Sequence, residues 1–209
     1  TRYLVMAELN EINATIVVNK ADLGIPDQAP FTQLDALGEL GYPSEVVSSH
    51  DPESLKPLHA RIQGRISLLA GQSGVGKSSL LNAFIPNLDV LTNGLSAATG
   101  KGKHTTTTTK LYPLPGDGYL ADSPGVWEYG LWVVDTPQLA HAFVDFRPFL
   151  DHCRFRDCTH HHEPGCAVTQ AVSDGQISEF RLDAWHRLLK EQQRFGPGPH
   201  HQGKGSPLA

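Results

Sequence analysis

The sequence has few cysteines, lacks long apolar runs and carries no excess of positive charge, and each shortage excludes a class of protein. The three cysteines among 209 residues are an odd number that argues against a disulfide framework. All three lie in the segment 153–166, which indicates a metal site in a reducing compartment. No apolar run approaches about 18 residues and no secretory signal opens the sequence, so we expect a cytoplasmic protein without a membrane span. The net charge of −5 excludes a generally basic nucleic-acid binder, although local basic patches remain compatible with it.

Strands and helices alternate along the first part of the chain, which predicts an α/β fold with a mainly parallel sheet. The apolar, β-branched run at 12–19 predicts a buried strand, the run at 65–71 predicts a strand that leads into a glycine loop, and short runs on both sides of 115–118 predict a hairpin. The spacing of Leu55, Leu58 and Ile62 marks a helix over 53–63. Beyond residue 135 the apolar side chains recur at helical spacing, in two sets: Leu139, Phe143, Phe146 and Leu150, then Ile177, Phe180, Ala184, Trp185, Leu188 and Leu189.

The segment GQSGVGKSSL, residues 71–80, fits the G-x-x-x-x-G-K-[ST] pattern of a phosphate-binding loop. An apolar strand precedes it and a helix follows, a context that favours this interpretation over a plain glycine turn. Lys77 would reach the β and γ phosphate oxygens, and the Ser78 hydroxyl would ligate Mg²⁺. The residues predicted to hold the nucleotide phosphates are Gly71, Gln72, Ser73, Gly74, Val75, Gly76, Lys77, Ser78 and Ser79.

The tetrad Asn19-Lys20-Ala21-Asp22 follows a predicted buried strand and matches a loop that reads guanine. Asp22 would accept hydrogen bonds from the ring N–H and the exocyclic amine of guanine, a paired donor edge that adenine lacks. The Lys20 stem would lie along the base, and Asn19 would tie this loop to the phosphate loop. Ser48 opens a Ser-Ser-His segment that we interpret as the supporting base loop, with a plain turn as the alternative.

Two further segments resemble the switches of a GTPase. Asp122 ends a predicted strand and would hold Mg²⁺ through water, while the Gly125 N–H would sense the γ-phosphate. Thr106 is our candidate for the threonine that ligates Mg²⁺, although Thr105 and a plain polar loop are alternatives.

The residue after the D-x-x-G motif is Val126, where many GTPases have a glutamine that orients the attacking water. A valine cannot hold water, so slow intrinsic hydrolysis is predicted. His104 is a candidate catalytic helper because imidazole can hydrogen-bond water at neutral pH, and a solvated loop histidine is the alternative.

The cysteines belong to the pattern C-x₄-C-x-H-x₅-C, formed by Cys153, Cys158, His160 and Cys166. Three thiolates and one imidazole predict a closed, tetrahedral zinc site of the structural type, without catalysis. Unrelated buried thiols beside a histidine-rich surface are the alternative.

The guanine motif precedes the phosphate loop, whereas an ordinary GTP-binding domain has the opposite order. A circular permutation gives this order and keeps the same three-dimensional site, because the termini of domains often lie close together. We therefore predict a circularly permuted P-loop GTPase domain over 1–134, a small α-helical zinc-binding domain over 135–195 and a disordered tail over 196–209. We also expect that a change in the bound nucleotide, sensed at Gly125, is transmitted to the zinc-binding domain.

This motif order resembles the ribosome small subunit-dependent GTPase A family, also written RsgA, YjeQ or EngC. The resemblance covers the chain up to about residue 195, and it rests on GQSGVGKSSLLN, HTT, DSPGVWEYGLW and C-x₄-C-T-H-x₅-C. It implies a bacterial cytoplasmic GTPase that binds GTP and GDP and acts late in maturation of the small (30S) ribosomal subunit. It further implies rRNA contacts and hydrolysis stimulated by that subunit. We expect a monomer.

The resemblance also implies an N-terminal OB-fold domain and a first strand of the permuted core, neither of which the sequence contains. By the usual strand order that strand is an interior one, and its absence would leave two unpaired ladders in the sheet. We therefore expect upstream residues in the folded polypeptide. The alternative functions are a GTP-sensing RNA or ribosome adaptor with incidental hydrolysis, a permuted GTPase of the large subunit and, disfavoured by Asp22, an ATPase.

Overall fold

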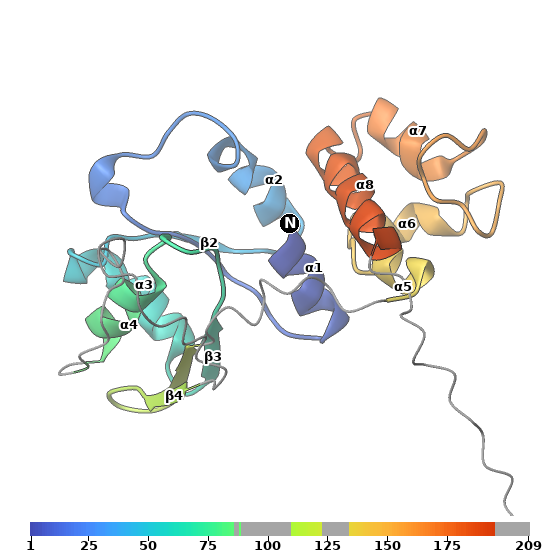
Figure 1. The fold of residues 1–209 in the computed structure, drawn as a ribbon. Helices are drawn as coiled ribbons and strands as arrows, with labels where there is room; N and C mark the ends of the chain where they lie inside the picture. Colours follow the sequence, from blue (N-terminus) through green and yellow to red (C-terminus); the bar gives the residue numbers. More distant parts are fainter. Residues whose placement is uncertain (86–87, 89–109, 123–133, 195–209) are drawn as a thin grey trace, which may run out of the picture. The chain divides into compact units, whose positions relative to one another are not determined.

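The computed structural model describes residues 1–85, 88, 110–122 and 134–194 (Figure 1). By its internal contacts the chain divides into two compact units. The first comprises Thr1–Asn13 and Gly130–Ala209, and the second comprises Ala14–Tyr129. In this division the first helix groups with the C-terminal helices, and the domain boundaries expected from the sequence, 1–134 and 135–195, stay a prediction. The predicted tail at 196–209 lies outside the described residues.

The described strands of the second unit form two separate sheets. In one of them, β1 (Ile16–Val18) pairs in parallel with β2 (Ser44–Val46). The other has the order β3-β5-β4, in which β5 (Tyr119–Asp122) is parallel to β3 (Ile66–Leu69) and antiparallel to β4 (Lys110–Pro113). The predicted hairpin and the runs at 12–19 and 65–71 therefore form strands, and the α/β class with parallel pairing is confirmed.

The outer edge of β3 has no strand partner among the described residues. Two of its apolar side chains are exposed, Ile66 by 75% and Leu68 by 41%. A strand that leads into a phosphate loop is ordinarily buried on both faces in a parallel sheet.

The α-helices in the described part of the second unit are α2 (Leu34–Glu39), α3 (Pro52–Ile62) and α4 (Lys77–Phe84). The Asp51 carboxylate caps α3 by accepting a hydrogen bond from the Glu53 N–H at 3.0 Å. The predicted helix at 53–63 is thus confirmed within a residue at each end. The core between helices and strands contains Val47, Leu55, Leu58, Leu80, Leu81, Phe84, Leu114 and Leu120.

The first unit is helical. Its helices are α1 (Arg2–Leu9), α5 (Thr136–His141), α6 (Arg147–Leu150), α7 (Ala167–Ser173) and α8 (Glu179–Arg194). Ion pairs fix α1 in this unit, from Glu8 to Arg147 at 2.7 Å and from Arg2 to Glu191. None of the helices in the described ranges is long and apolar enough to cross a membrane.

Aromatic side chains make up the centre of the helical unit. The Phe143 and Phe146 rings stack with their centroids 4.9 Å apart, and the Trp185 ring meets both edge-on. A buried ion pair lies beside them, with Arg181 Nη2 2.7 Å from Asp145 Oδ1 and the guanidinium 4.7 Å from the Phe143 ring centre. The helical spacing in the sequence thus identified buried residues on α5 and α8, and it identified Phe143 and Phe146 between α5 and α6, whereas Leu150 on α6 is only half-buried.

Candidate nucleotide site and metal centre

The predicted phosphate loop connects β3 to α4. Gly76 has a positive φ of 94° and forms the N-terminal cap of α4, where its carbonyl accepts the Leu80 N–H at 2.9 Å. Lys77 Nζ donates to the carbonyls of Gly71 and Gln72 at 2.7 and 2.8 Å, so the ammonium group lies over the loop. Because α4 begins directly after the loop, an anion held there would lie at a helix N-terminus, where backbone N–H groups favour negative charge.

The guanine loop contacts the phosphate loop through two side chains. Asn19 Nδ2 donates to the Val75 carbonyl at 3.2 Å and lies 3.4 Å from the Gly76 carbonyl. Lys20, which has a positive φ of 66°, donates through Nζ to the Gly74 carbonyl at 2.7 Å. Residues separated by more than 50 positions in the sequence therefore meet at one place, as their motif types predict.

Asp22 is held by the neighbouring base loop. The Ser48 hydroxyl donates to Asp22 Oδ1 at 2.5 Å, and this hydrogen bond is the main cause that lowers the pKa of Asp22. The Ala21 N–H donates to the Val47 carbonyl at 3.1 Å, and Ser49 N–H donates to Asn19 Oδ1 at 3.3 Å. The carboxylate is thus ionised and positioned as an acceptor, the form that pairs with the donor edge of guanine.

Ser54 is a residue that the sequence reasoning missed. Its hydroxyl oxygen accepts the Ser48 N–H at 2.9 Å and donates to the Asp51 carbonyl at 2.8 Å, so the first turn of α3 fixes the base loop. The available signal was the position of Ser54, three residues after the helix-capping Asp51, where a hydroxyl can reach back to preceding backbone groups.

The last strand residue, Asp122, lies beside the phosphate loop. It pairs in register with Leu69 of β3, two residues before Gly71. Ser78 and Ser79 lie in the first turn of α4 directly after Lys77, and Ser73 lies within the loop. Four residues with predicted or alternative switch roles, together with Val126, fall outside the described residues: His104, Thr105, Thr106 and Gly125.

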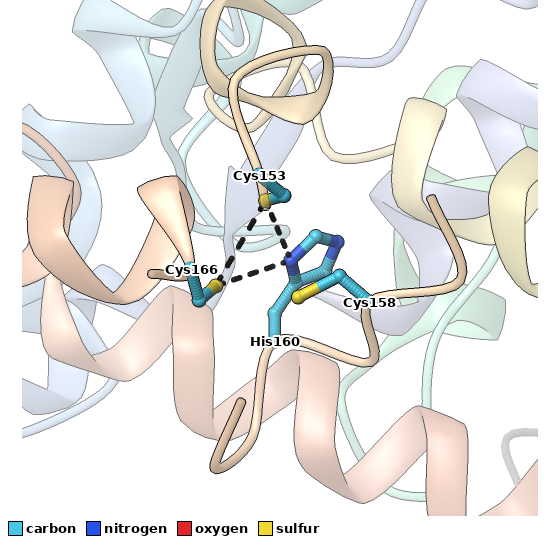
Figure 2. Close-up of side chains that lie close together, drawn as sticks. All are labelled: Cys153, Cys158, His160 and Cys166. Atoms are coloured by element: carbon cyan, nitrogen blue, oxygen red, sulfur yellow. Dashed lines mark hydrogen bonds between the residues drawn. The ribbon is translucent and has the colours of Figure 1, made fainter. Parts of the chain in front are cut away.

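The predicted metal ligands gather in the helical unit. Figure 2 shows Cys153, Cys158, His160 and Cys166 pointing toward one another, and their ligand atoms all lie within 4.8 Å. Cys153 follows α6, Cys158 and His160 lie in the next loop, and Cys166 caps α7. Among the described residues this is the only group of three or more potential ligands found so close together.

The donor distances fit a tetrahedral zinc ion. With Zn–S of about 2.3 Å and Zn–N of about 2.0–2.1 Å, two sulfur ligands lie about 3.8 Å apart, and a sulfur and a nitrogen about 3.6 Å apart. His160 Nδ1 lies 3.4 Å from Cys166 Sγ and 3.6 Å from Cys153 Sγ, and the two sulfurs are 4.0 Å apart. His161 and His162, the neighbours that could compete with His160, are exposed, whereas His160 is buried.

The protonation of the cluster also fits a cation. Burial raises the pKa of the Cys158 thiol to about 12, and the nearby Cys166 adds to this increase. Burial lowers the pKa of His160, so its imidazole is neutral and has a free lone pair. Three closely packed thiols cannot all ionise by themselves, and a divalent metal ion would supply the charge that makes them thiolates.

Glu163 supports the loop that carries His160. Its Oε1 accepts the Thr159 N–H at 2.7 Å and the Thr159 hydroxyl at 2.5 Å, while Oε2 accepts the N–H groups of His161 and His162 at 3.0 and 3.1 Å. Burial alone would raise the pKa of Glu163, but these hydrogen bonds hold it well below its usual range. Trp185 Nε1 donates to the Thr159 carbonyl at 2.7 Å and fixes the same turn from α8.

Comparisons with known proteins agree with this geometry. The "Small ribosomal subunit biogenesis GTPase RsgA" of Klebsiella pneumoniae (strain 342) is 47% identical over 197 residues, which cover 92% of this chain and 56% of that protein. The crystal structure of YjeQ from Thermotoga maritima superposes with a TM-score of 0.72 at 34% identity, over 92% of this chain and 64% of the other. The structure of YloQ, described as a circularly permuted GTPase, superposes with a TM-score of 0.67 at 34% identity, over 94% and 63%.

The chain therefore spans about half to two thirds of the length of these relatives. Its fold is that of the circularly permuted GTPases, which explains why the guanine loop precedes the phosphate loop. The family described as RsgA GTPase matches residues 1–132. This chain belongs to the RsgA GTPase family.

Proposed function

We propose that this chain binds and hydrolyses GTP and acts in the biogenesis of the small ribosomal subunit. The observation that carries the proposal is the contact of the guanine loop with the phosphate loop, in which Asn19 and Lys20 donate to carbonyls of Val75 and Gly74. Base recognition and phosphate binding are thereby combined in one site. The name of the Klebsiella relative supports the ribosomal assignment.

In the proposed mechanism, Asp22 selects guanine and the loop at 71–76 surrounds the phosphates. Lys77 leaves its contacts with the Gly71 and Gln72 carbonyls and pairs with the β and γ oxygens. Ser78 and, through water, Asp122 would hold Mg²⁺, which supplies charge to the phosphate oxygens when it is bound. We assign the threonine that would also ligate Mg²⁺ to Thr106.

The positioning of the attacking water is the incomplete part of this mechanism. Val126 has no polar atom with which to orient water, so we infer slow turnover in the isolated protein. The proposal gives Gly125 contact with the γ-phosphate and His104 a helper role. We propose that binding to the small subunit completes the arrangement.

The helical unit supplies a structural zinc site in this proposal, with Cys153, Cys158, His160 and Cys166 as its four ligands. No position would remain open for catalysis. We further propose contact with rRNA, a cytoplasmic location, a monomeric state and the domain boundaries 1–134 and 135–195.

The test is GTP turnover by the full-length protein with and without purified small ribosomal subunits. The proposal requires that the subunit stimulates GTP turnover. It also requires that an Asp22→Ala variant loses most of this turnover at limiting GTP. GTP-dependent binding to the subunit without stimulation would favour the adaptor function. ATP turnover equal to GTP turnover, unchanged by Asp22→Ala, would contradict the assigned base specificity.

A further inference from the structure

Three histidines near the zinc ligands take no part in either site described above. The ring centres of His161 and His162 are 3.7 Å apart, and those of His161 and His186 are 4.5 Å apart. His161 and His162 are exposed on the loop after His160, whereas His186 is half-buried on α8. Two elements that are distant in sequence therefore bring three imidazoles to one place on the surface.

The hydrogen bond of His186 fixes which of its nitrogens is available. His186 Nε2 lies 2.9 Å from the His160 carbonyl oxygen, which can only accept a hydrogen bond. The neutral imidazole therefore carries its proton on Nε2 and its lone pair on Nδ1. A ring nitrogen that donates to a carbonyl while the other offers its lone pair is the usual state of a histidine metal ligand.

The backbone of the other two histidines is fixed in advance. Glu163 Oε2 accepts both of their N–H groups, and its Oε1 is held by Thr159. The loop that presents His161 and His162 therefore does not have to be ordered when a ligand binds, which reduces the entropic cost of binding. This arrangement is built from several elements, unlike a chance pair of adjacent histidines on a loop.

We propose that His161, His162 and His186 form a second, solvent-facing site for a divalent transition-metal ion of the Zn²⁺, Ni²⁺ or Cu²⁺ class. Imidazole donors without thiolates or carboxylates select this class of ion over Mg²⁺ and Ca²⁺. The rings meet edge to face, at interplanar angles of 74° and 73°, so binding rotates the exposed rings until their nitrogens converge. The site is distinct from the buried Cys₃His cluster, which has no exposed donor nitrogen.

The experiment titrates Ni²⁺ into the full-length protein by calorimetry, after one equivalent of zinc has been added and excess zinc removed. All proteins carry His200→Ala and His201→Ala, because these two C-terminal histidines could bind Ni²⁺ by themselves. The variants are His186→Ala and His161→Ala, and the matched control is His141→Ala, an exposed histidine on α5 of the same unit. Zinc content is measured before and after each titration.

The proposal expects one Ni²⁺ per chain, with an affinity that falls at least about tenfold in His186→Ala and in His161→Ala and is unchanged in His141→Ala. Unchanged zinc content in the variants would show that the fold around the Cys₃His cluster is preserved. Three results would overturn the proposal: equal Ni²⁺ affinity in all variants, release of one zinc for each Ni²⁺ bound, or no saturable binding. The comparison between variants does not depend on the nucleotide site, so its failure leaves the proposed GTPase function untouched.

Discussion

The four hydrogen bonds accepted by Glu163 make a quantitative prediction about metal affinity. A Glu163→Gln substitution keeps the size and shape of the side chain but replaces one acceptor oxygen with an NH₂ group. Two of the four donors on Thr159, His161 and His162 then lose their acceptor and face another donor. The turn that presents His160 to the three thiols is weakened, although no ligand has changed.

The magnitude follows from the number and type of bonds lost. A hydrogen bond to a charged group contributes about 1.5–3 kcal/mol when buried, and the Glu163 site is half-buried, so we use about 1 kcal/mol for each of the two bonds. A loss of about 2 kcal/mol corresponds to roughly 30-fold weaker zinc binding. Supporting residues around other metal sites have effects of about 10- to 100-fold, so this value is reasonable.

Competition between the full-length protein and a chromophoric chelator would measure the zinc dissociation constant. A Thr159→Val variant removes only the hydrogen bond that the Thr159 hydroxyl donates to Glu163 Oε1, so its zinc affinity should fall only about fivefold. Glu179→Gln on α8 is the matched control, because this glutamate is exposed and lies in the same unit. Zinc affinity in Glu163→Gln within about threefold of the parent protein would refute the reasoning.

Two other predictions concern stability. Gly74 and Gly76 both have positive φ, but a Cβ would meet different surroundings at the two positions. A Cβ added at Gly76 would lie 2.2 Å from Asn19 Nδ2, the side-chain amide that joins the guanine loop to the phosphate loop. A Cβ added at Gly74 would meet nothing within 4 Å. In urea unfolding of the nucleotide-free full-length protein, Gly76→Ala should therefore lower the free energy of unfolding by at least about 1 kcal/mol more than Gly74→Ala does. Equal losses of stability in the two variants would argue against the contact of Asn19 with the phosphate loop. Asp145→Ala leaves the Arg181 guanidinium buried without its partner and should cost about 3–5 kcal/mol in the same assay. A loss below about 1 kcal/mol would mean that water reaches this pair.

The proposed nucleotide and metal sites could be predicted from the sequence because their motifs are contiguous. A phosphate loop places its glycines and lysine within a few residues, so Gly76 and Lys77 could be assigned from spacing alone. The same holds for the four metal ligands, whose separations allow one loop to surround one ion. The guanine motif is recognised with the short strand that precedes it, and the apolar run at 12–19 predicts that strand.

The supporting residues were not accessible from sequence, because their roles depend on contacts between distant segments. Ser54 positions the base loop only because α3 begins next to that loop. Arg181 donates hydrogen bonds to Asp145, which lies 36 residues earlier in the sequence. The grouping of α1 with the C-terminal helices has the same origin, since it depends on the pairing of Glu8 with Arg147. Local patterns carry no information about such partners.

The position of Trp185 gives the helical unit its own optical signal. The sequence has three tryptophans, and the other two are Trp127 and Trp132, next to the predicted switch at Gly125. Trp185 is fully buried, its indole nitrogen bonds the Thr159 carbonyl, and its ring centre lies 5.5 Å from that of His160. Replacing Trp127 and Trp132 with phenylalanine would leave a single fluorophore that reports whether the loop of the zinc ligands is formed. The fluorescence of Trp185 would then report changes in the helical unit separately from changes around the bound nucleotide, in a single sample.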